Sequence, residues 1–143
     1  MRRLIITASC LLLLALVPAS LSAQPDRAQA ATALRAQDGS LVGSVSFTQV
    51  GGKVLVHAET WGLQPGFHGF HVHAVGACSG DFTSAAGHLN RSGASHARHD
   101  GEMPSLYVAA DGTATLRFET DRYSVADLFD ADASAVIVHA GPD

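Results

Sequence analysis

Hydrophobic and polar residues alternate along most of the chain in short segments, the pattern typical of half-buried antiparallel β-strands. The alternation is clearest in residues 41–48, 53–59, 113–119 and 135–140. The turn-forming dipeptides Asp38-Gly39, Gly51-Gly52 and Asp111-Gly112 lie beside or between these segments, as in β-hairpins. Together they predict an all-β fold.

In residues 66–73, Gly-Phe-His-Gly-Phe-His-Val-His, the alternation places histidines where they can act together. In a strand, His71 and His73 face the same side, roughly 6.5–7 Å apart, while the apolar residues between them face the core. Two imidazoles so placed can converge on one metal ion. His68 has the opposite parity, so we expect it to form structural hydrogen bonds. His57, on the wetter face of its strand, is expected to be solvated.

Between residues 74 and 104 the alternation stops. This stretch contains five glycines, Cys78, His88, His96 and His99. A loop this long in a compact domain is usually either functional or disordered. We expect a functional loop, because the outward-facing His71 and His73 need a cover. Further along, the pattern predicts a short helical turn over residues 124–129 and a last strand over 135–140, which carries His139.

The N-terminal residues 1–23 have the features of a secretory signal peptide: Arg2 and Arg3, an apolar run, and small residues near Ala23. A membrane anchor is the alternative, although the run is short for a span. We expect a flexible lead over residues 24–31 and one domain over 32–143. Removal of the signal changes the formal net charge from −4 to −6, which argues against a nucleic-acid partner.

Three motifs together resemble the copper/zinc superoxide dismutases, most closely their secreted bacterial branch. They are the histidine segment 66–73, the segment Thr-Ser-Ala-Ala-Gly-His-Leu-Asn at 83–90, and Val-Ile-Val-His-Ala-Gly at 136–141. The resemblance extends from about Leu34 to the end of the chain. It implies a Greek-key, immunoglobulin-like β-sandwich or barrel, which agrees with the hairpin pattern.

By this resemblance the copper ligands are His71, His73, His88 and His139. His88 is then the catalytic residue that bridges copper to zinc and delivers a proton. The implied zinc ligands are His88, His96, His99 and Glu102. Glu102 replaces the family's aspartate, with Asp100 as a neighbouring competitor, and the loop is shorter than usual. The alternative is a copper-only relative.

Family members continue beyond the His-Ala-Gly-Pro-Asp stretch into a charged loop and a last strand. That region carries an arginine at the copper channel and the cysteine that pairs with the counterpart of Cys78. Since neither follows residue 143 here, we expect a C-terminally incomplete domain with an unfilled sheet edge, and Cys78 without its disulfide partner. Arg91 and Arg98, the basic residues of the loop, are either solvated charges or guides for an anionic substrate.

The resemblance implies an extracytoplasmic superoxide dismutase, secreted or periplasmic, with copper and zinc as cofactors and superoxide as substrate. Two alternatives remain: a non-enzymatic copper-binding protein of the same fold, and a poorly folded fragment that binds no metal. We expect no nucleic-acid partner and no stable membrane insertion after signal removal. A homodimer is one arrangement that the resemblance leaves open.

Overall fold

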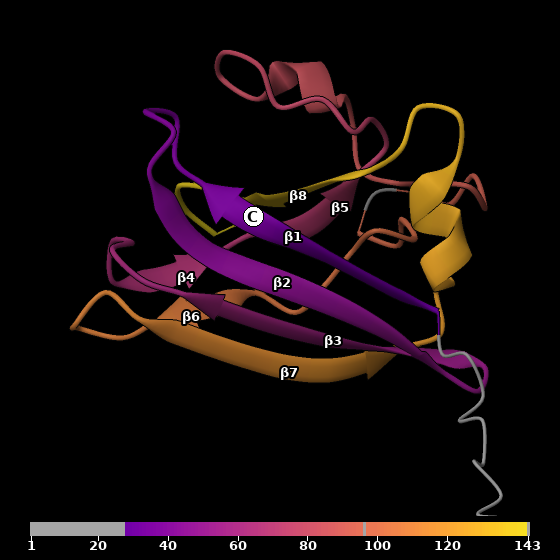
Figure 1. Ribbon diagram of the computed structural model, residues 1–143, viewed down its shortest axis with the longest axis horizontal. Coiled ribbons are helices and arrows are strands. Elements are labelled where there is room, and N and C mark those ends of the chain that lie inside the picture. Colours follow the sequence, from indigo (N-terminus) through magenta and orange to yellow (C-terminus); the bar gives the residue numbers. More distant parts are fainter. Residues whose placement is uncertain (1–27, 96, 143) are drawn as a thin grey trace, which may run out of the picture.

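The computed structural model describes residues 28–95 and 97–142, and within them the chain forms eight strands and two short 3-10 helices (Figure 1). The elements in chain order are β1 (Gln29–Arg35), β2 (Leu41–Val50), β3 (Lys53–Thr60), β4 (Gly66–His68), β5 (Phe70–His73), η1 (Thr83–Ala85), β6 (Leu106–Val108), β7 (Ala114–Thr120), η2 (Val125–Phe129) and β8 (Ala135–Val138). The all-β prediction is confirmed. The predicted signal peptide lies outside the described residues. Within them, no helix has the length and apolarity needed to cross a membrane.

One layer is a four-stranded antiparallel sheet in the order β1-β2-β3-β7 (Figure 1). The register aligns Phe47 of β2 with Val56 of β3, and Val56 with Phe118 of β7. Because side chains alternate along a strand, this row faces the core while its neighbours face water. Val54, Val56 and Ala58, which occupy alternate positions of β3, are all fully buried.

The opposite layer consists of two antiparallel pairs, β4-β6 and β5-β8. The chain leaves the four-stranded sheet after β3, forms β4, β5 and β6, and returns as β7 to pair with β3. This return beside an earlier strand is the Greek-key connection that the resemblance implied. As a result β5 pairs with β8, bringing together segments separated by more than sixty residues in the sequence.

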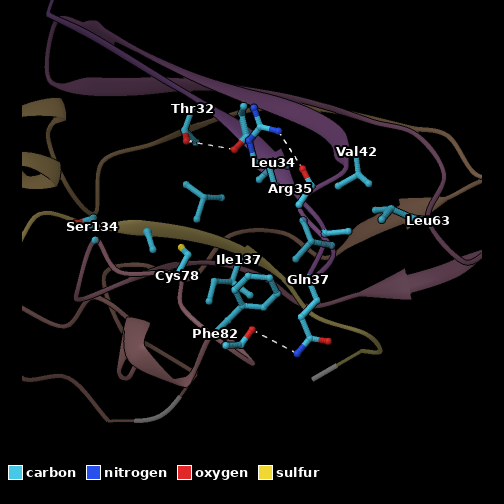
Figure 2. A pocket seen from close by; sticks show the side chains of 18 residues that line it. Thr32, Leu34, Arg35, Gln37, Val42, Leu63, Cys78, Phe82, Ser134 and Ile137 are labelled. Carbon is cyan, nitrogen blue, oxygen red and sulfur yellow. Dashed lines mark hydrogen bonds between the residues drawn. The ribbon is translucent and has the colours of Figure 1, made fainter.

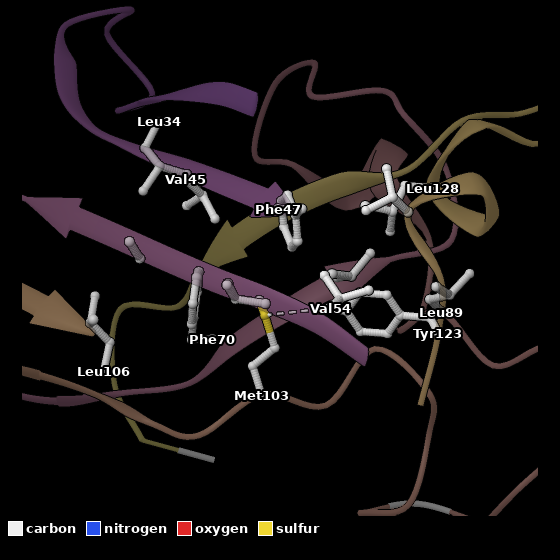
Figure 3. Packing of buried hydrophobic residues seen from close by; sticks show 14 of the residues in the cluster. Leu34, Val45, Phe47, Val54, Phe70, Leu89, Met103, Leu106, Tyr123 and Leu128 are labelled. Carbon is white, nitrogen blue, oxygen red and sulfur yellow. Dashed lines mark hydrogen bonds between the residues drawn. The ribbon is translucent and has the colours of Figure 1, made fainter. Parts of the chain in front are cut away.

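The core fills the space between these layers (Figure 3). Val45 and Phe47 enter it from β2, Phe70 from β5 and Leu106 from β6. Phe70 is fully buried, as expected for the inward face of β5. His71 and His73, on the other face, are nevertheless also buried, because the long loop covers them.

Two boundaries differ from the sequence prediction. The expected flexible lead included residues 29–31, but these residues begin β1 and pair with Thr48, Phe47 and Ser46 of β2. The prediction of a flexible lead was therefore wrong for residues 29–31. Pairing with a neighbouring strand, which the local pattern does not reveal, orders this alanine-rich segment. The last strand was expected over 135–140, whereas β8 ends at Val138 and leaves His139 just beyond it.

Among the described residues, β1 and β8 are each hydrogen-bonded to a neighbouring strand along one side only. A cavity of about 490 Å³ lies between them, with Leu34 and Ile137 on its walls (Figure 2). Cys78 also lines this cavity; it is exposed and forms no disulfide within the described part of the chain. The thiol therefore lies at the cavity between these two strands.

Candidate metal centre

Two groups of possible metal ligands lie side by side in the described residues. The first contains His71, His73, His88 and His139, and the second contains His88, His99 and Glu102. In each group, one ligand atom from every member lies within 4.8 Å of the others. His88 belongs to both groups, and since an imidazole has two nitrogens it can serve one group with each.

Strand pairing positions three of the four histidines in the first group. His71 and His73 lie on β5, and His139 follows β8, the strand paired with β5. The amide of His139 donates to the Gly69 carbonyl over 2.8 Å, which extends the pairing by one step past β8. The imidazoles of His73 and His139 face each other, with 3.4 Å between their Nε2 atoms.

Two segments of the long loop run along the other edge of β5 and supply further members of the two ligand groups. His88 forms an isolated bridge with His73, and Glu102 forms one with His71. The Leu89 amide donates to the Val72 carbonyl over 2.8 Å, and the Val72 amide donates to the Gly101 carbonyl over 2.9 Å. The loop therefore meets β5 almost as another strand would, which confirms the expected cover over its histidines.

Gly101 allows this close approach. A Cβ atom at this position would lie 2.2 Å from the Val72 carbonyl oxygen, far inside the closest normal contact. Only glycine fits without displacing the backbone of β5 or of the loop. The glycine before Glu102 thus determines how near the carboxylate lies to His71.

Hydrogen bonds to backbone carbonyls orient two of the rings. Nδ1 of His73 lies 2.9 Å from the Ala86 carbonyl oxygen, which can only accept. Nδ1 therefore carries the proton, and Nε2 keeps its lone pair toward the group. His68, as predicted, has a structural role: Nδ1 lies 2.7 Å from the carbonyl oxygen of His139, and Nε2 lies 2.8 Å from that of Gln64.

Glu102 lies between three imidazoles. Its Oε1 is 2.9 Å from Nδ1 of His88 and 3.2 Å from Nδ1 of His99, and its Oε2 is 3.2 Å from Nε2 of His71. Burial alone would raise the pKa of this carboxyl, but the hydrogen bond from His88 and the surrounding imidazoles outweigh it and lower the pKa. Glu102 is therefore an anion at neutral pH.

The structure favours Glu102 over its neighbour as the acidic member. Asp100 accepts hydrogen bonds from the amide and hydroxyl of Ser92, at 2.8 and 2.9 Å, and lies outside both groups. His96, the remaining predicted zinc ligand, is outside the described residues. His57 lies away from the site, 3.4 Å from Glu59 on β3.

Sequence reasoning missed two contributors. Arg122 donates to the His99 carbonyl over 3.1 Å and so ties the second group to the segment after β7. The Ala86 carbonyl orients His73. Arg122 could have been noticed in the sequence as a basic residue just after a predicted strand. The Ala86 carbonyl could not, because every residue has a backbone carbonyl.

The described residues that line the cavity beside His73 and His139 include no lysine or arginine. This cavity, of about 700 Å³, contains Asp81 as its one charged side chain among those residues. Of the two basic loop residues, Arg91 forms an ion pair with Asp127 and Arg98 is exposed. Neither lines the cavity.

Comparison with known proteins decides the family. The profile of copper/zinc superoxide dismutase matches residues 41–143, which include every member of both groups. The chain belongs to the copper/zinc superoxide dismutase family. The resemblance seen in the sequence is thereby confirmed. The family's name includes copper and zinc, and the two groups could each hold a metal ion.

Individual family members agree in sequence and in fold. A Cu-Zn superoxide dismutase of Mycolicibacterium paratuberculosis is 38% identical over 126 residues, covering 78% of this chain and 56% of its own length. One from Caulobacter vibrioides is 35% identical and covers 80% and 74%. The crystal structure of a SOD-like protein from Bacillus subtilis superimposes with a TM-score of 0.71 at 28% identity, covering 79% of this chain and 84% of that one.

Proposed function

We propose that this chain is an extracytoplasmic superoxide dismutase that holds copper at His71, His73, His88 and His139. The observation that carries the proposal is the convergence of these four imidazoles from three separate segments. A donor set of neutral imidazoles suits copper. Zinc is proposed at His88, His99 and Glu102, with His96 as a further ligand taken from the sequence.

The orientation of the rings supports this assignment. Nδ1 of His73 faces the Ala86 carbonyl and Nδ1 of His88 faces Glu102, so both rings have Nε2 available for copper. Nε2 of His139 already lies 3.4 Å from Nε2 of His73. Nitrogens of the four histidines thus approach one another without any ring having to turn.

The reaction consumes two superoxide anions and two protons and yields one molecule of oxygen and one of hydrogen peroxide. Copper, when bound, would supply the one-electron exchange in both halves. The role of the chain is to hold the imidazoles in place and to deliver a proton. His88 is the proposed proton carrier at Nε2, while Nδ1, on the other side of its ring, faces Glu102 of the second group.

The test combines metal content and activity on one purified sample after loading with copper and zinc. We expect one copper per chain and superoxide dismutation. The variant His139→Ala should lose both, whereas His57→Ala, a histidine on the exposed face of β3, should keep both. Undiminished copper and activity in His139→Ala would refute the proposed copper set.

A second candidate is a copper-binding protein without the activity. The cavity beside His73 and His139 favours it, because its described lining offers Asp81 and no basic residue to attract an anion. One copper per chain without dismutation would establish this candidate. The proposed export is checked by whether the mature N-terminus of the secreted protein starts near Ala23, and a homodimer by sedimentation.

A further inference from the structure

Two of the four proposed copper ligands, His73 and His139, line the cavity of about 700 Å³ described above. Apolar side chains form much of the rest of its described wall, namely Leu63, Phe82, Ile137 and Val138. Asp81 is the one charged side chain among the described lining residues. A small ion that approaches the four-histidine group through this cavity therefore meets a negative charge and, from that lining, no lysine or arginine.

Two other cavities offer a poorer approach to the same group. One of about 540 Å³ includes only His71 of the four histidines, and this ring is 3% exposed. Its charges are mixed, since Arg122 lines it together with Glu102 and Glu119. The cavity between β1 and β8 is lined by none of the four histidines. The cavity that contains Asp81 is thus the best approach of the three.

The carboxylate of Asp81 is held by its neighbour Thr83 and is ionised at neutral pH. The hydroxyl and the amide of Thr83 donate to its Oδ1 over 2.7 and 3.3 Å. These hydrogen bonds, the one from the side chain first, hold the pKa of Asp81 below its ordinary value of 3.8. A negative charge in a hollow with apolar walls raises the local concentration of cations and lowers that of anions.

We propose that this cavity is the entrance for copper ions and that Asp81 attracts them toward His73 and His139. The inference rests on the proposed function and extends it from how the chain holds copper to how the ion arrives. The same charge repels superoxide, which is an anion, so Asp81 should affect copper uptake and dismutation in opposite directions. A structural defect would instead impair both.

The first experiment measures the rate at which the metal-free protein takes up Cu(II), by stopped flow in a buffer that does not bind copper. We expect the association rate constant to fall a few-fold in Asp81→Asn and by roughly tenfold in Asp81→Lys, the low end of the range for charged clefts. The copper finally bound should stay at one per chain, because all four proposed ligands remain. At about 1 M salt the Debye length is only about 3 Å, so the differences should disappear.

Asp111→Asn is a matched control for the loss of one charge. Asp111 accepts hydrogen bonds at Oδ1 from the amide and hydroxyl of Thr113 over 3.0 and 2.7 Å, the same local arrangement as Asp81 and Thr83. It does not line the cavity, so its substitution should change copper uptake little. An equal fall in Asp111→Asn and Asp81→Asn would overturn the inference, because net charge alone would then determine the rate.

The second experiment measures the rate constant for superoxide per bound copper at low salt. We expect it to rise from the unaltered protein to Asp81→Asn and further to Asp81→Lys. Slower uptake combined with slower dismutation would indicate a structural defect and overturn the inference, as would uptake that is independent of residue 81.

The proposed function can fail separately from this inference. Copper uptake that depends on Asp81 in a protein without dismutase activity would support the entrance and refute the enzymatic activity. A protein that binds no copper after loading would refute the proposed copper set and the entrance together.

Discussion

At the scale of single residues, the site depends on how each imidazole is held as much as on which residues are present. His73 is fixed by the Ala86 carbonyl, and His68 connects the carbonyls of Gln64 and His139. His68 is 5% exposed, so removing the ring would take a donor from at least one of these carbonyls in a place that water reaches poorly. The stability of the His139 segment should therefore depend on His68.

We expect His68→Phe, which keeps an aromatic ring but removes the nitrogens that face the two carbonyls, to lower the free energy of unfolding by about 1–3 kcal/mol. Copper should still bind at one per chain, because all four proposed ligands remain, but with lower affinity. Denaturant unfolding and a copper titration check this. Full stability in the variant would show that the two contacts contribute little.

The sequence predicted these residues unequally well. Strand parity correctly placed His71 and His73 on one face of β5, because side chains alternate regularly along a strand. His68 lies on the separate strand β4, where its partners confirm the predicted structural role. The contact between Glu102 and His71 could not be predicted, since it depends on how a loop of irregular conformation approaches the strand. Local pattern carries no information on that approach.

At the scale of elements, the loop from 74 to 104 is held to β5 by backbone contacts that need a residue without a side chain. We expect Gly101→Ala to destabilise the fold by about 1–3 kcal/mol, because the added Cβ collides with the Val72 carbonyl. Zinc affinity should fall with it, since Glu102 would be displaced. Thermal unfolding and zinc titration measure both effects.

The matched control is Gly52→Ala in the turn between β2 and β3, where an added Cβ meets nothing within 4 Å. This variant should be as stable as the unaltered protein. Equal unfolding temperatures for the two alanine variants would contradict the steric argument.

Helix η2 begins with a reciprocal interaction that makes stability depend on pH. Asp127 accepts hydrogen bonds from the amide and hydroxyl of Ser124, both over 2.8 Å, and pairs with Arg91. The hydrogen bond from the Ser124 amide, followed by the other contacts, outweighs burial and lowers the pKa of Asp127 below 3.8. Since the folded pKa is depressed, the stabilisation is present above pH 3.8 and is lost as the pH falls through the folded value.

We therefore expect Asp127→Asn to lower the free energy of unfolding by about 1 kcal/mol at pH 7. The difference from the unaltered protein should shrink below pH 3.8 and vanish once Asp127 is protonated in both states. Urea unfolding at a series of pH values tests this. A difference that grows at acid pH would have the wrong sign.

Prediction of elements from sequence followed the strength of the alternation. The regular segments at 41–48, 53–59 and 113–119 became β2, β3 and β7, and the short turn at 124–129 became η2. The prediction of a flexible lead was wrong for Gln29, Ala30 and Ala31, because these residues are ordered by their pairing with β2. Pairing of that kind depends on the tertiary fold.

At the scale of the whole molecule, metals and fold should stabilise each other. A ligand that binds only the native state raises its stability by about 2.7 kcal/mol at a free concentration of 100 times Kd. We expect copper and zinc loading to raise the unfolding temperature and chelation to reverse the rise. Calorimetry should show a smaller rise for His139→Ala, and an equal rise in both proteins would place the stabilising metal elsewhere.

The pairing of β5 with β8 also determines the stage of folding at which the four-histidine site forms. His73 and His139 are 66 residues apart, so no early part of the folding chain can bring them together. The nascent or partly unfolded polypeptide has scattered imidazoles but not the four-histidine chelate. Copper capture by this chelate is therefore a late event, and a copper-specific spectrum that develops during refolding would time the closure of the last strand.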